Sequence, residues 1–229
     1  MQSSSSFSAE SVFSSVRVVT LELIAGAFAV AGSHWRKGAV VIVLVGLVLW
    51  AMLPREMMWL AFVQGDKTPA LNHLAKFLSA WGDFFPGTLI VSAFLGTCGW
   101  ITGKSRLQQA AYACLLAAAL GGLSTDVLKI GFGRARPNSG IADGLYGPSF
   151  RAKLHGFPSG HTTAAMATGI SVAVVAPELA VPAIAYGAGV GWSRMYLNWH
   201  RPTDVVAGAM VGSMFGLAFG VAARKRVGL

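Results

Sequence analysis

The sequence predicts an all-α membrane protein with about six transmembrane helices and one amphipathic helix at the interface. Of its 229 residues, 54% are hydrophobic and only 12% are charged, and the mean hydropathy is +0.59. This composition is typical of polytopic membrane proteins and excludes an ordinary soluble domain. The net charge of +9 does not indicate nucleic acid as a partner, because the basic residues are scattered between apolar stretches.

The N-terminal segment predicts a tail followed by one weakly apolar helix. Residues 1–16 are rich in serine and lack hydrophobic periodicity, so we expect a mobile tail ahead of a single membrane domain over residues 17–229. Residues 17–32 are apolar but include Glu22, which favours a helix that lies in the interface or enters it obliquely. Ala29-Val30-Ala31 resembles a signal-peptidase site, but no excess of positive charge precedes it, which argues against a cleaved signal peptide.

Six stronger apolar runs supply the predicted membrane crossings. They lie at about 38–53, 86–103, 107–128, 161–177, 180–197 and 203–223. Several approach the roughly 20 residues that a bilayer crossing needs. The last run carries four glycines spaced four residues apart, namely Gly208, Gly212, Gly216 and Gly220. This spacing predicts a smooth helix face against which a neighbouring helix packs closely.

A shorter amphipathic segment lies between the first and second crossings. Leu71, Leu74, Leu78 and Trp81 recur at helical spacing, with polar residues off that face. The pattern predicts a helix over 69–82 that lies on the membrane surface.

Three segments that carry charged residues fall on one side of the membrane if the first crossing runs outward. They are Lys129, the 131–160 connection and the 193–204 segment. We therefore expect a composite site near the outer interface. The distribution of Lys and Arg supports this orientation only after the cations of the candidate site are set aside.

The 193–204 segment combines an anion binder, an imidazole and a carboxylate in Arg194, His200 and Asp204. Such groups are costly at a membrane boundary unless they have a function. If residues 198–203 enter a helix, Asp204 can hold one ring nitrogen of His200 and leave the other free to attack an electrophile. The alternative is a capped helix start whose charges face water.

The second segment places Lys129 and Arg136 on either side of a glycine-containing turn. The glycines let the backbone leave the helix, and Pro137 disfavours helix at Arg136, so the two cations can converge. A planar guanidinium and an ammonium together suit a phosphate group. A positively charged membrane flank is the alternative, and Arg134 and Arg201 beside these segments are possible secondary contacts.

The third segment, Pro158-Ser159-Gly160-His161, opens the fourth apolar run. Ser159 can cap the helix, and Gly160 lets a ligand approach the backbone N–H groups at the positive helix end. His161 then reaches the same pocket. Alone, it would more often be a histidine at a helix start without a catalytic role.

Together, Lys129-x6-Arg136-Pro137, Pro158-Ser159-Gly160-His161 and Ser193-Arg194-x5-His200-x3-Asp204 resemble the three-part signature of the type 2 phosphatidic acid phosphatase superfamily. Order and spacing agree, without a mismatch at these positions. The resemblance covers residues 129–204, and the six-crossing plan is similar to that of the bacterial integral-membrane lipid phosphatases of this family.

The resemblance implies a phosphatase that acts on a lipid phosphate or pyrophosphate through a phosphohistidine. His200 would be the nucleophile, Asp204 its orienting partner and His161 the acid. The implied phosphate-binding residues are Lys129, Arg136, Ser159, Gly160 and Arg194. No cofactor or metal is expected, since the cations outnumber the potential ligands and would repel a divalent ion.

The expected partners are the lipid substrate and other membrane lipids, in a bacterial inner membrane with the active site on the outer side. One alternative is a phosphotransferase that passes the phosphoryl group to a second lipid through the same intermediate. A second is a carrier that binds phosphate through the three cations without chemistry, which leaves the histidines and Asp204 unexplained. The substrate lipid and the oligomeric state stay open at this stage.

Overall fold

The structure, a computed structural model, describes residues 9–65 and 67–228. These residues are mostly helical, and within them the only β-type pairing is an isolated bridge between Arg134 and Leu145. The predicted all-α class is therefore confirmed.

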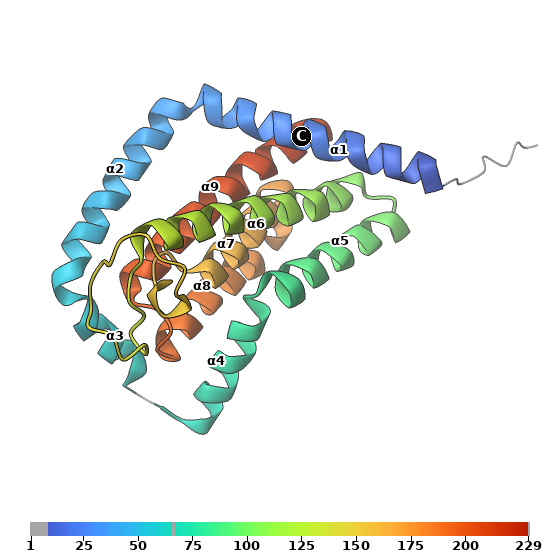
Figure 1. Ribbon diagram of the computed structural model, residues 1–229. Coiled ribbons are helices and arrows are strands. Elements are labelled where there is room, and N and C mark those ends of the chain that lie inside the picture. The colour runs from blue at the N-terminus through green and yellow to red at the C-terminus, as the bar shows by residue number, and fades with distance from the viewer. Residues whose placement is uncertain (1–8, 66, 229) are drawn as a thin grey trace, which may run out of the picture.

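Nine α-helices form the described part of the chain (Figure 1). They are α1 (Ala9–Ser33), α2 (Trp35–Met52), α3 (Glu56–Gln64), α4 (Pro69–Trp81), α5 (Leu89–Ile101), α6 (Ser105–Phe132), α7 (Gly160–Val175), α8 (Ala180–Tyr196) and α9 (Pro202–Arg226). Single turns at Leu53–Arg55, Ala152–Leu154 and Pro177–Leu179 are 3-10 helical, and Phe84–Thr88 forms a π-helical turn that leads into α5.

Each of the six predicted apolar runs forms a helix, namely α2 and α5 to α9. By length and apolar composition, five helical stretches could cross a membrane: Ser14–Ser33, Trp35–Gln64, Phe84–Ile101, Ser105–Phe132 and Pro202–Arg226. Helix α7 has 16 residues and rises roughly 24 Å, less than the roughly 30 Å of a bilayer core. The exact count of six crossings thus stays a prediction.

Helix α7 lies at the centre of the bundle, packed against α6, α8 and α9. Its contact with α9 uses the predicted glycine stripe. A Cβ atom on Gly208 would lie 2.5 Å from the Ser159 carbonyl oxygen, and one on Gly212 would lie 2.3 Å from the Thr163 carbonyl oxygen. The glycines therefore let α9 touch the backbone of α7, and they bring the starts of both helices together.

Helix α1 begins at Ala9, so residues 9–16, which the sequence analysis assigned to the tail, are helical. Ala and Glu, which follow the serine run at positions 9 and 10, are strong helix formers and extend the helix. Residues 1–8 of the predicted tail lie outside the described residues. Helix α1 crosses the far end of α9 (Figure 1), where Leu23 is buried and Glu22 pairs with Arg226.

The predicted amphipathic helix is confirmed as α4, whose start is capped by the Thr68 hydroxyl accepting from the Leu71 backbone N–H at 3.2 Å. Its buried side differs from the predicted leucine face. Ala75 and Ser79 are buried, whereas Leu74 is exposed. Leu71, Leu78 and Trp81 of the predicted face are half-buried, and Leu78 lies against Gly189 of α8. The contact with α8 is therefore made by small residues together with part of the predicted face.

The glycine stripe generates a stability prediction. Gly212→Ala places a methyl group in steric conflict with the Thr163 carbonyl oxygen. Such overpacking lowers the free energy of unfolding by about 1–3 kcal/mol. We expect a lower Tm in detergent, measured by thermal unfolding. Gly46→Ala in α2 is the matched control, since nothing lies within 4 Å of its Cβ position, and its Tm should equal or exceed that of the parent. An unchanged Tm for Gly212→Ala would contradict the close packing.

Candidate active site

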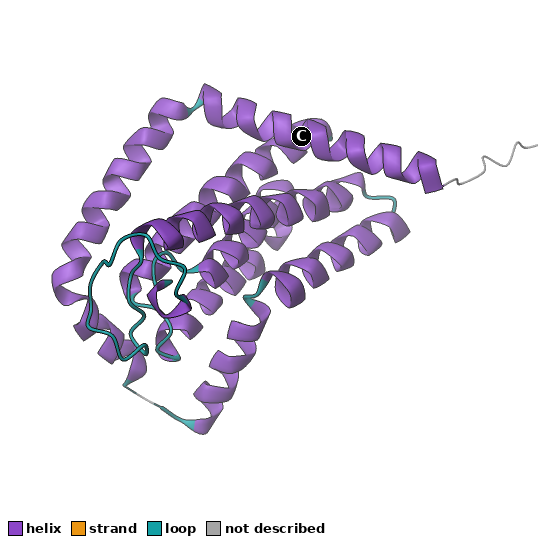
Figure 2. Ribbon diagram, viewed as in Figure 1, coloured by secondary structure: helices purple, strands orange, loops and turns teal. Residues whose placement is uncertain are grey.

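The three signature segments converge at one end of the bundle. Lys129 lies in the last turn of α6, His161 in the first turn of α7, and the third segment spans the end of α8 and the start of α9. The connection from Gly133 to Ser159 covers this end as a loop without regular strands (Figure 2). The structure thus brings the three predicted segments together, and their role as one site stays a prediction.

The loop folds back because of Gly133, which ends α6 in the left-handed conformation at φ +57°. A Cβ atom there would lie 1.9 Å from the Gly147 carbonyl oxygen, so only glycine fits. The last part of the loop then forms backbone hydrogen bonds with the first part of the loop. The Gly156 N–H donates to the Arg134 carbonyl at 2.8 Å, and the Arg136 N–H donates to the Lys153 carbonyl at 3.0 Å. This pairing holds Arg136 over the ends of α7 and α8.

Two arginines of the signature share one aromatic ring. The guanidinium carbons of Arg136 and Arg194 lie 5.5 Å and 5.4 Å from the centroid of the Trp199 ring. The Nε atoms of both arginines are buried and have no hydrogen-bond partner among the described residues. Burial lowers the pKa of Arg136 from its ordinary value. Two adjacent, incompletely bonded cations make a site that favours an anion.

Arg194 also has a partner that sequence reasoning missed. Its Nη1 donates to the Ser79 hydroxyl of α4 at 2.5 Å. The amphipathic helix thus contacts the anion-binding residues directly. Its pattern predicted a surface helix, and a serine on such a helix carries no signal of this contact.

Lys129 and His161 border a cavity next to these arginines. A Cβ atom on Gly160 would lie 2.6 Å from the Lys129 ammonium nitrogen, which shows how closely that cation approaches the start of α7. Lys129 also pairs with Asp126 at 2.8 Å, and the charges of Lys129, Arg136 and Arg194 act on the His161 imidazole.

The cavity has a volume of about 560 Å³ and continues between helices. Beyond Lys129, Gly160 and His161, its walls include Phe84 and Phe85 of the π-helical turn and Leu123 of α6. Phe85 and Leu123 are also largely exposed on the outside of the bundle. The charged end of the cavity, where Lys129 lies with Asp83 and Asp126, is therefore continuous with an apolar groove that a hydrocarbon chain can occupy.

His200 is buried, with 2% of its surface exposed. Its Nδ1 lies 2.7 Å from the Gly156 carbonyl oxygen and 3.8 Å from Oδ2 of Asp204. A carbonyl only accepts, so Nδ1 carries the proton and Nε2 carries the lone pair. We expected Asp204 to hold this nitrogen, but Gly156 holds it instead, and Asp204 acts as a nearby negative charge. Burial lowers the pKa of His200, and the Asp204 carboxylate opposes that shift.

Asp204 makes its closer contacts elsewhere. Its Oδ2 accepts from the Arg201 backbone N–H at 2.8 Å, which caps α9, and its Oδ1 accepts from Arg134 at 2.7 Å. Ser159 joins the same centre, because its backbone N–H donates to the Asp204 carbonyl oxygen at 3.0 Å. The predicted side-chain cap by Ser159 is absent among the described residues, and its hydroxyl accepts from Thr162 instead.

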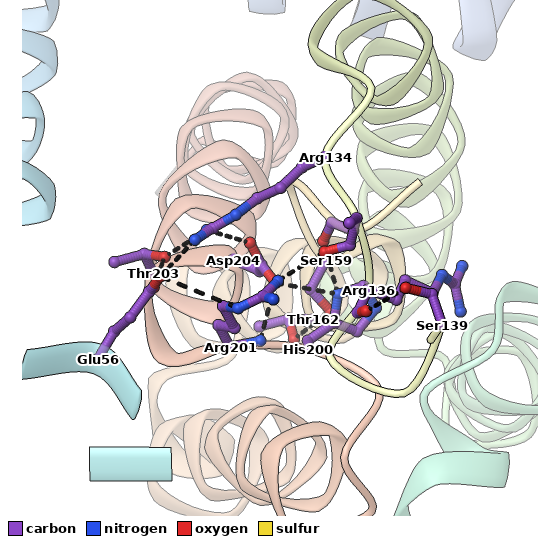
Figure 3. Close-up of polar contacts among 12 residues, drawn as sticks. Glu56, Arg134, Arg136, Ser139, Ser159, Thr162, His200, Arg201, Thr203 and Asp204 are labelled. Atoms are coloured by element: carbon purple, nitrogen blue, oxygen red, sulfur yellow. Dashed lines mark hydrogen bonds and ion pairs between the residues drawn. The ribbon is translucent and has the colours of Figure 1, made fainter. Parts of the chain in front are cut away.

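Arg134 and Arg201, which the sequence analysis considered as secondary phosphate contacts, bind protein groups instead. Arg134 lies between Asp204 and Glu56 (Figure 3), and Arg201 binds Asp143 at 3.0 Å and the Ala135 carbonyl at 2.5 Å. Sequence reasoning missed Glu56. The available signal was a carboxylate at the start of the apolar stretch that follows the first crossing.

The sequence resembles those of known membrane phosphatases. The sequence profile of the PAP2 superfamily matches residues 110–227. A lipid A 1-phosphatase of Rhizobium johnstonii is 31% identical over 186 residues, which cover 75% of this chain and 76% of that protein. The undecaprenyl-diphosphatase BcrC of Bacillus subtilis is 33% identical over 63 residues, which cover 28% of this chain and 33% of that protein.

Two solved structures share the fold. A transmembrane PAP2-type phosphatidylglycerolphosphate phosphatase from Bacillus subtilis superposes with a TM-score of 0.59 at 19% identity, covering 82% of this chain and 96% of that one. Aquifex aeolicus LpxE superposes with a TM-score of 0.52 at 21% identity, covering 72% and 93% of the two chains. At these identities the likeness shows the fold.

The paired arginines generate a binding prediction. Inorganic phosphate should raise the Tm of the purified protein in detergent, by an amount equivalent to about 2.7 kcal/mol at 100 times its Kd. Arg136→Gln should abolish the shift. Arg151→Gln, at an exposed position of the same loop, is the matched control and should retain it. A parental phosphate shift in Arg136→Gln would contradict the assigned anion site.

Proposed function

This chain belongs to the PAP2 superfamily, and we propose that it hydrolyses a phosphate or pyrophosphate monoester of a membrane lipid through a phosphohistidine. The observation that carries the proposal is the meeting of two histidines with Lys129, Arg136 and Arg194 at the end of a membrane bundle. Fixed cations that stabilise the charge of the phosphoryl group are the main requirement of phosphoryl transfer.

The first step is attack by Nε2 of His200 on phosphorus. Nδ1 keeps its proton on the Gly156 carbonyl, which aims the lone pair of Nε2 away from the loop. As the N–P bond forms, the bond from phosphorus to the lipid oxygen breaks. His161, which becomes protonated when the negative phosphate offsets the charges of the surrounding cations, gives that oxygen a proton. In the second step His161 takes a proton from water, whose oxygen attacks phosphorus. The N–P bond then breaks and inorganic phosphate leaves.

The proposed absence of a metal rests on charge. The three signature cations and two additional arginines lie at this end of the bundle, whereas Asp204 and Glu56 are already bound by arginine. A divalent cation would be repelled by the first set and would have to displace arginine from the second. Protein cations therefore supply the charge stabilisation that a metal supplies elsewhere.

The apolar groove supports a lipid as substrate. A chain that lies along Phe84, Phe85 and Leu123 would bring its head group to Lys129 and His161. Binding energy from the chain can then be used to position the reacting phosphate. The relative matched over three quarters of this chain is named for lipid A, so a lipid A 1-phosphate is the first substrate to test, with an isoprenyl pyrophosphate second.

A phosphotransferase would share the first step and differ only in its acceptor, a lipid hydroxyl in place of water. A phosphate carrier would need the cations but not His200. Release of inorganic phosphate from a lipid by the purified protein separates both from the proposal, because a transferase leaves the phosphate on lipid and a carrier leaves the lipid intact.

The mechanism predicts that His200→Ala abolishes phosphate release, with a loss of roughly 1,000-fold or more, because no other group supplies the nucleophile. Denaturation in alkaline detergent with radiolabelled lipid phosphate, which preserves the acid-labile N–P bond, should trap a phosphoenzyme in the parent and none in His200→Ala. His73→Ala on the exposed side of α4 is the control and should keep parental turnover.

The proposed absence of a metal predicts that phosphate release also survives EDTA. Phosphate release by a well-folded His200→Ala, or a loss with EDTA that a divalent ion restores, would refute the mechanism.

We also propose that the site faces the outer side of a bacterial inner membrane. The basic groups at Arg36 and Lys37, at Lys104 and Arg106, and at Arg224, Lys225 and Arg226 lie at the α1–α2 junction, the α5–α6 turn and the end of α9. All three places are at the end opposite the loop (Figure 1). Cytoplasmic ends are marked by an excess of Lys and Arg, and this end qualifies once the cations of the candidate site are set aside.

This orientation predicts opposite labelling of two single cysteines, each in a background without Cys98 and Cys114. An impermeant maleimide should label Asn138→Cys, in the loop over the site, from outside. Gly228→Cys, after α9, should react only once the cells are permeabilised. Labelling of both from outside would break the crossing plan, and the reversed pattern would place the site in the cytoplasm.

A further inference from the structure

Helix α3 contacts the nucleophile segment with both of its ends. At its first residue, Glu56 is only 3% exposed, and at its last residue, Gln64 donates to the Met195 carbonyl at 2.9 Å and to the Asn198 side chain at 3.0 Å. Asn198 is the one described non-glycine residue with positive φ, and it forms the turn that leads to His200. Helix α3 therefore braces the segment on either side of His200.

Both carboxylate oxygens of Glu56 are occupied. Oε1 accepts from Nη2 of Arg134, and Oε2 accepts from the Thr203 hydroxyl at 2.5 Å. A buried carboxylate is retained only when such partners compensate its loss of water. Glu56 also lies outside the three signature segments and outside residues 110–227, so neither the signature nor the family match accounts for it.

The bond network continues from Glu56 to the nucleophile (Figure 3). The second terminal nitrogen of Arg134, Nη1, donates to Thr203 and to Oδ1 of Asp204, both at 2.7 Å. The other oxygen of Asp204 caps α9 and lies 3.8 Å from Nδ1 of His200. Arg134 is thus shared between two carboxylates, and its position relative to Asp204 depends on Glu56.

Charge balance gives Glu56 a second effect. Without its charge, Arg134 would have Asp204 as its one buried carboxylate partner, and the half-exposed Asp143 lies 4.0 Å away. Arg134 would then be drawn fully onto Asp204. The Asp204 carboxylate would then offset less of the positive charge that the neighbouring cations place near His200. The start of α9 would also lose the contact that Glu56 makes with Thr203.

We propose that Glu56 is a positioning residue for phosphoryl transfer, acting on His200 through Arg134 and Asp204. The inference rests on the proposed role of His200 as nucleophile. Glu56 does not touch Arg136, Arg194 or Lys129, so it should govern the rate of the chemical step and leave phosphate binding unchanged.

The test is Glu56→Gln, which keeps the size of the side chain and removes its charge. In detergent with a lipid phosphate, kcat should fall on the order of 10- to 100-fold, the effect of a misplacement near 1 Å, with KM within about twofold of the parent. The single-turnover rate of phosphoenzyme formation should fall equally. The Tm shift given by inorganic phosphate should be retained, since the arginines over Trp199 are untouched.

Two further variants and a control distinguish positioning from general support of the fold. Glu56→Asp, whose carboxylate is one methylene shorter, should have a kcat between the parent and Glu56→Gln. In the double variant Glu56→Gln/Arg134→Gln, the fall in kcat should be smaller than the product of the falls in the two single variants, because both substitutions act on Asp204 through the same chain of contacts. Glu178→Gln removes a half-exposed Glu–Arg pair elsewhere in the bundle and should keep parental kcat and KM.

The outcomes separate this inference from the proposed function. An active His200→Ala would remove the proposed function and this inference with it. An inactive His200→Ala together with parental kcat in Glu56→Gln would overturn only the role of Glu56, and so would a loss of the phosphate-induced Tm shift in a folded Glu56→Gln. If Glu56→Gln does not fold, Glu56→Asp decides: a lowered kcat at parental KM supports the inference, and a parental kcat overturns it.

Discussion

The contact between the backbones of α7 and α9 is the constraint on which the rest of the site depends. Gly208 lets the start of α9 lie against Ser159, so His161 at the start of α7 and His200 just before α9 come close enough to interact electrostatically. Any side chain at that glycine would separate the two helix starts, and the imidazoles would move apart with them. Packing in the membrane core thus determines geometry at the membrane surface, because both elements are rigid over that distance.

The cations at this end of the bundle form two electrostatic classes. Arg134 and Arg201 form ion pairs with Glu56, Asp204 and Asp143, so their charges are neutralised by other groups of the protein. Arg136 and Arg194 instead lie over the ring of Trp199 and make no ion pair with a carboxylate of the described residues. The protein stabilises the second class incompletely, which preorganises it for an incoming anion and avoids rearrangement at the moment of reaction.

The sequence predicted the helical class, the six apolar runs and the meeting of the three signature segments, since those depend on hydropathy and local spacing. It did not reveal the hydrogen bond of Gly156 to His200, because a backbone carbonyl carries no sequence signal. Glu56 and Ser79 were missed for a related reason. Their partners lie far away in the chain, and only tertiary packing shows that an isolated carboxylate or serine meets an arginine. The extent of α1 was also underestimated, because serines obscured its start.

The walls and the charged end of the 560 Å³ cavity are built from different parts of the molecule. Chemistry is confined to helix ends held by glycine contacts, whereas Phe84, Phe85 and Leu123 are side chains that line the groove without taking part in the hydrogen-bonded centre. Substitutions along the walls can therefore change which lipid the groove holds while the hydrogen-bonded centre keeps its geometry. In evolutionary terms, such a scaffold can diverge toward lipids of different shape by changes at a few wall positions, without any change in the groups that carry the reaction.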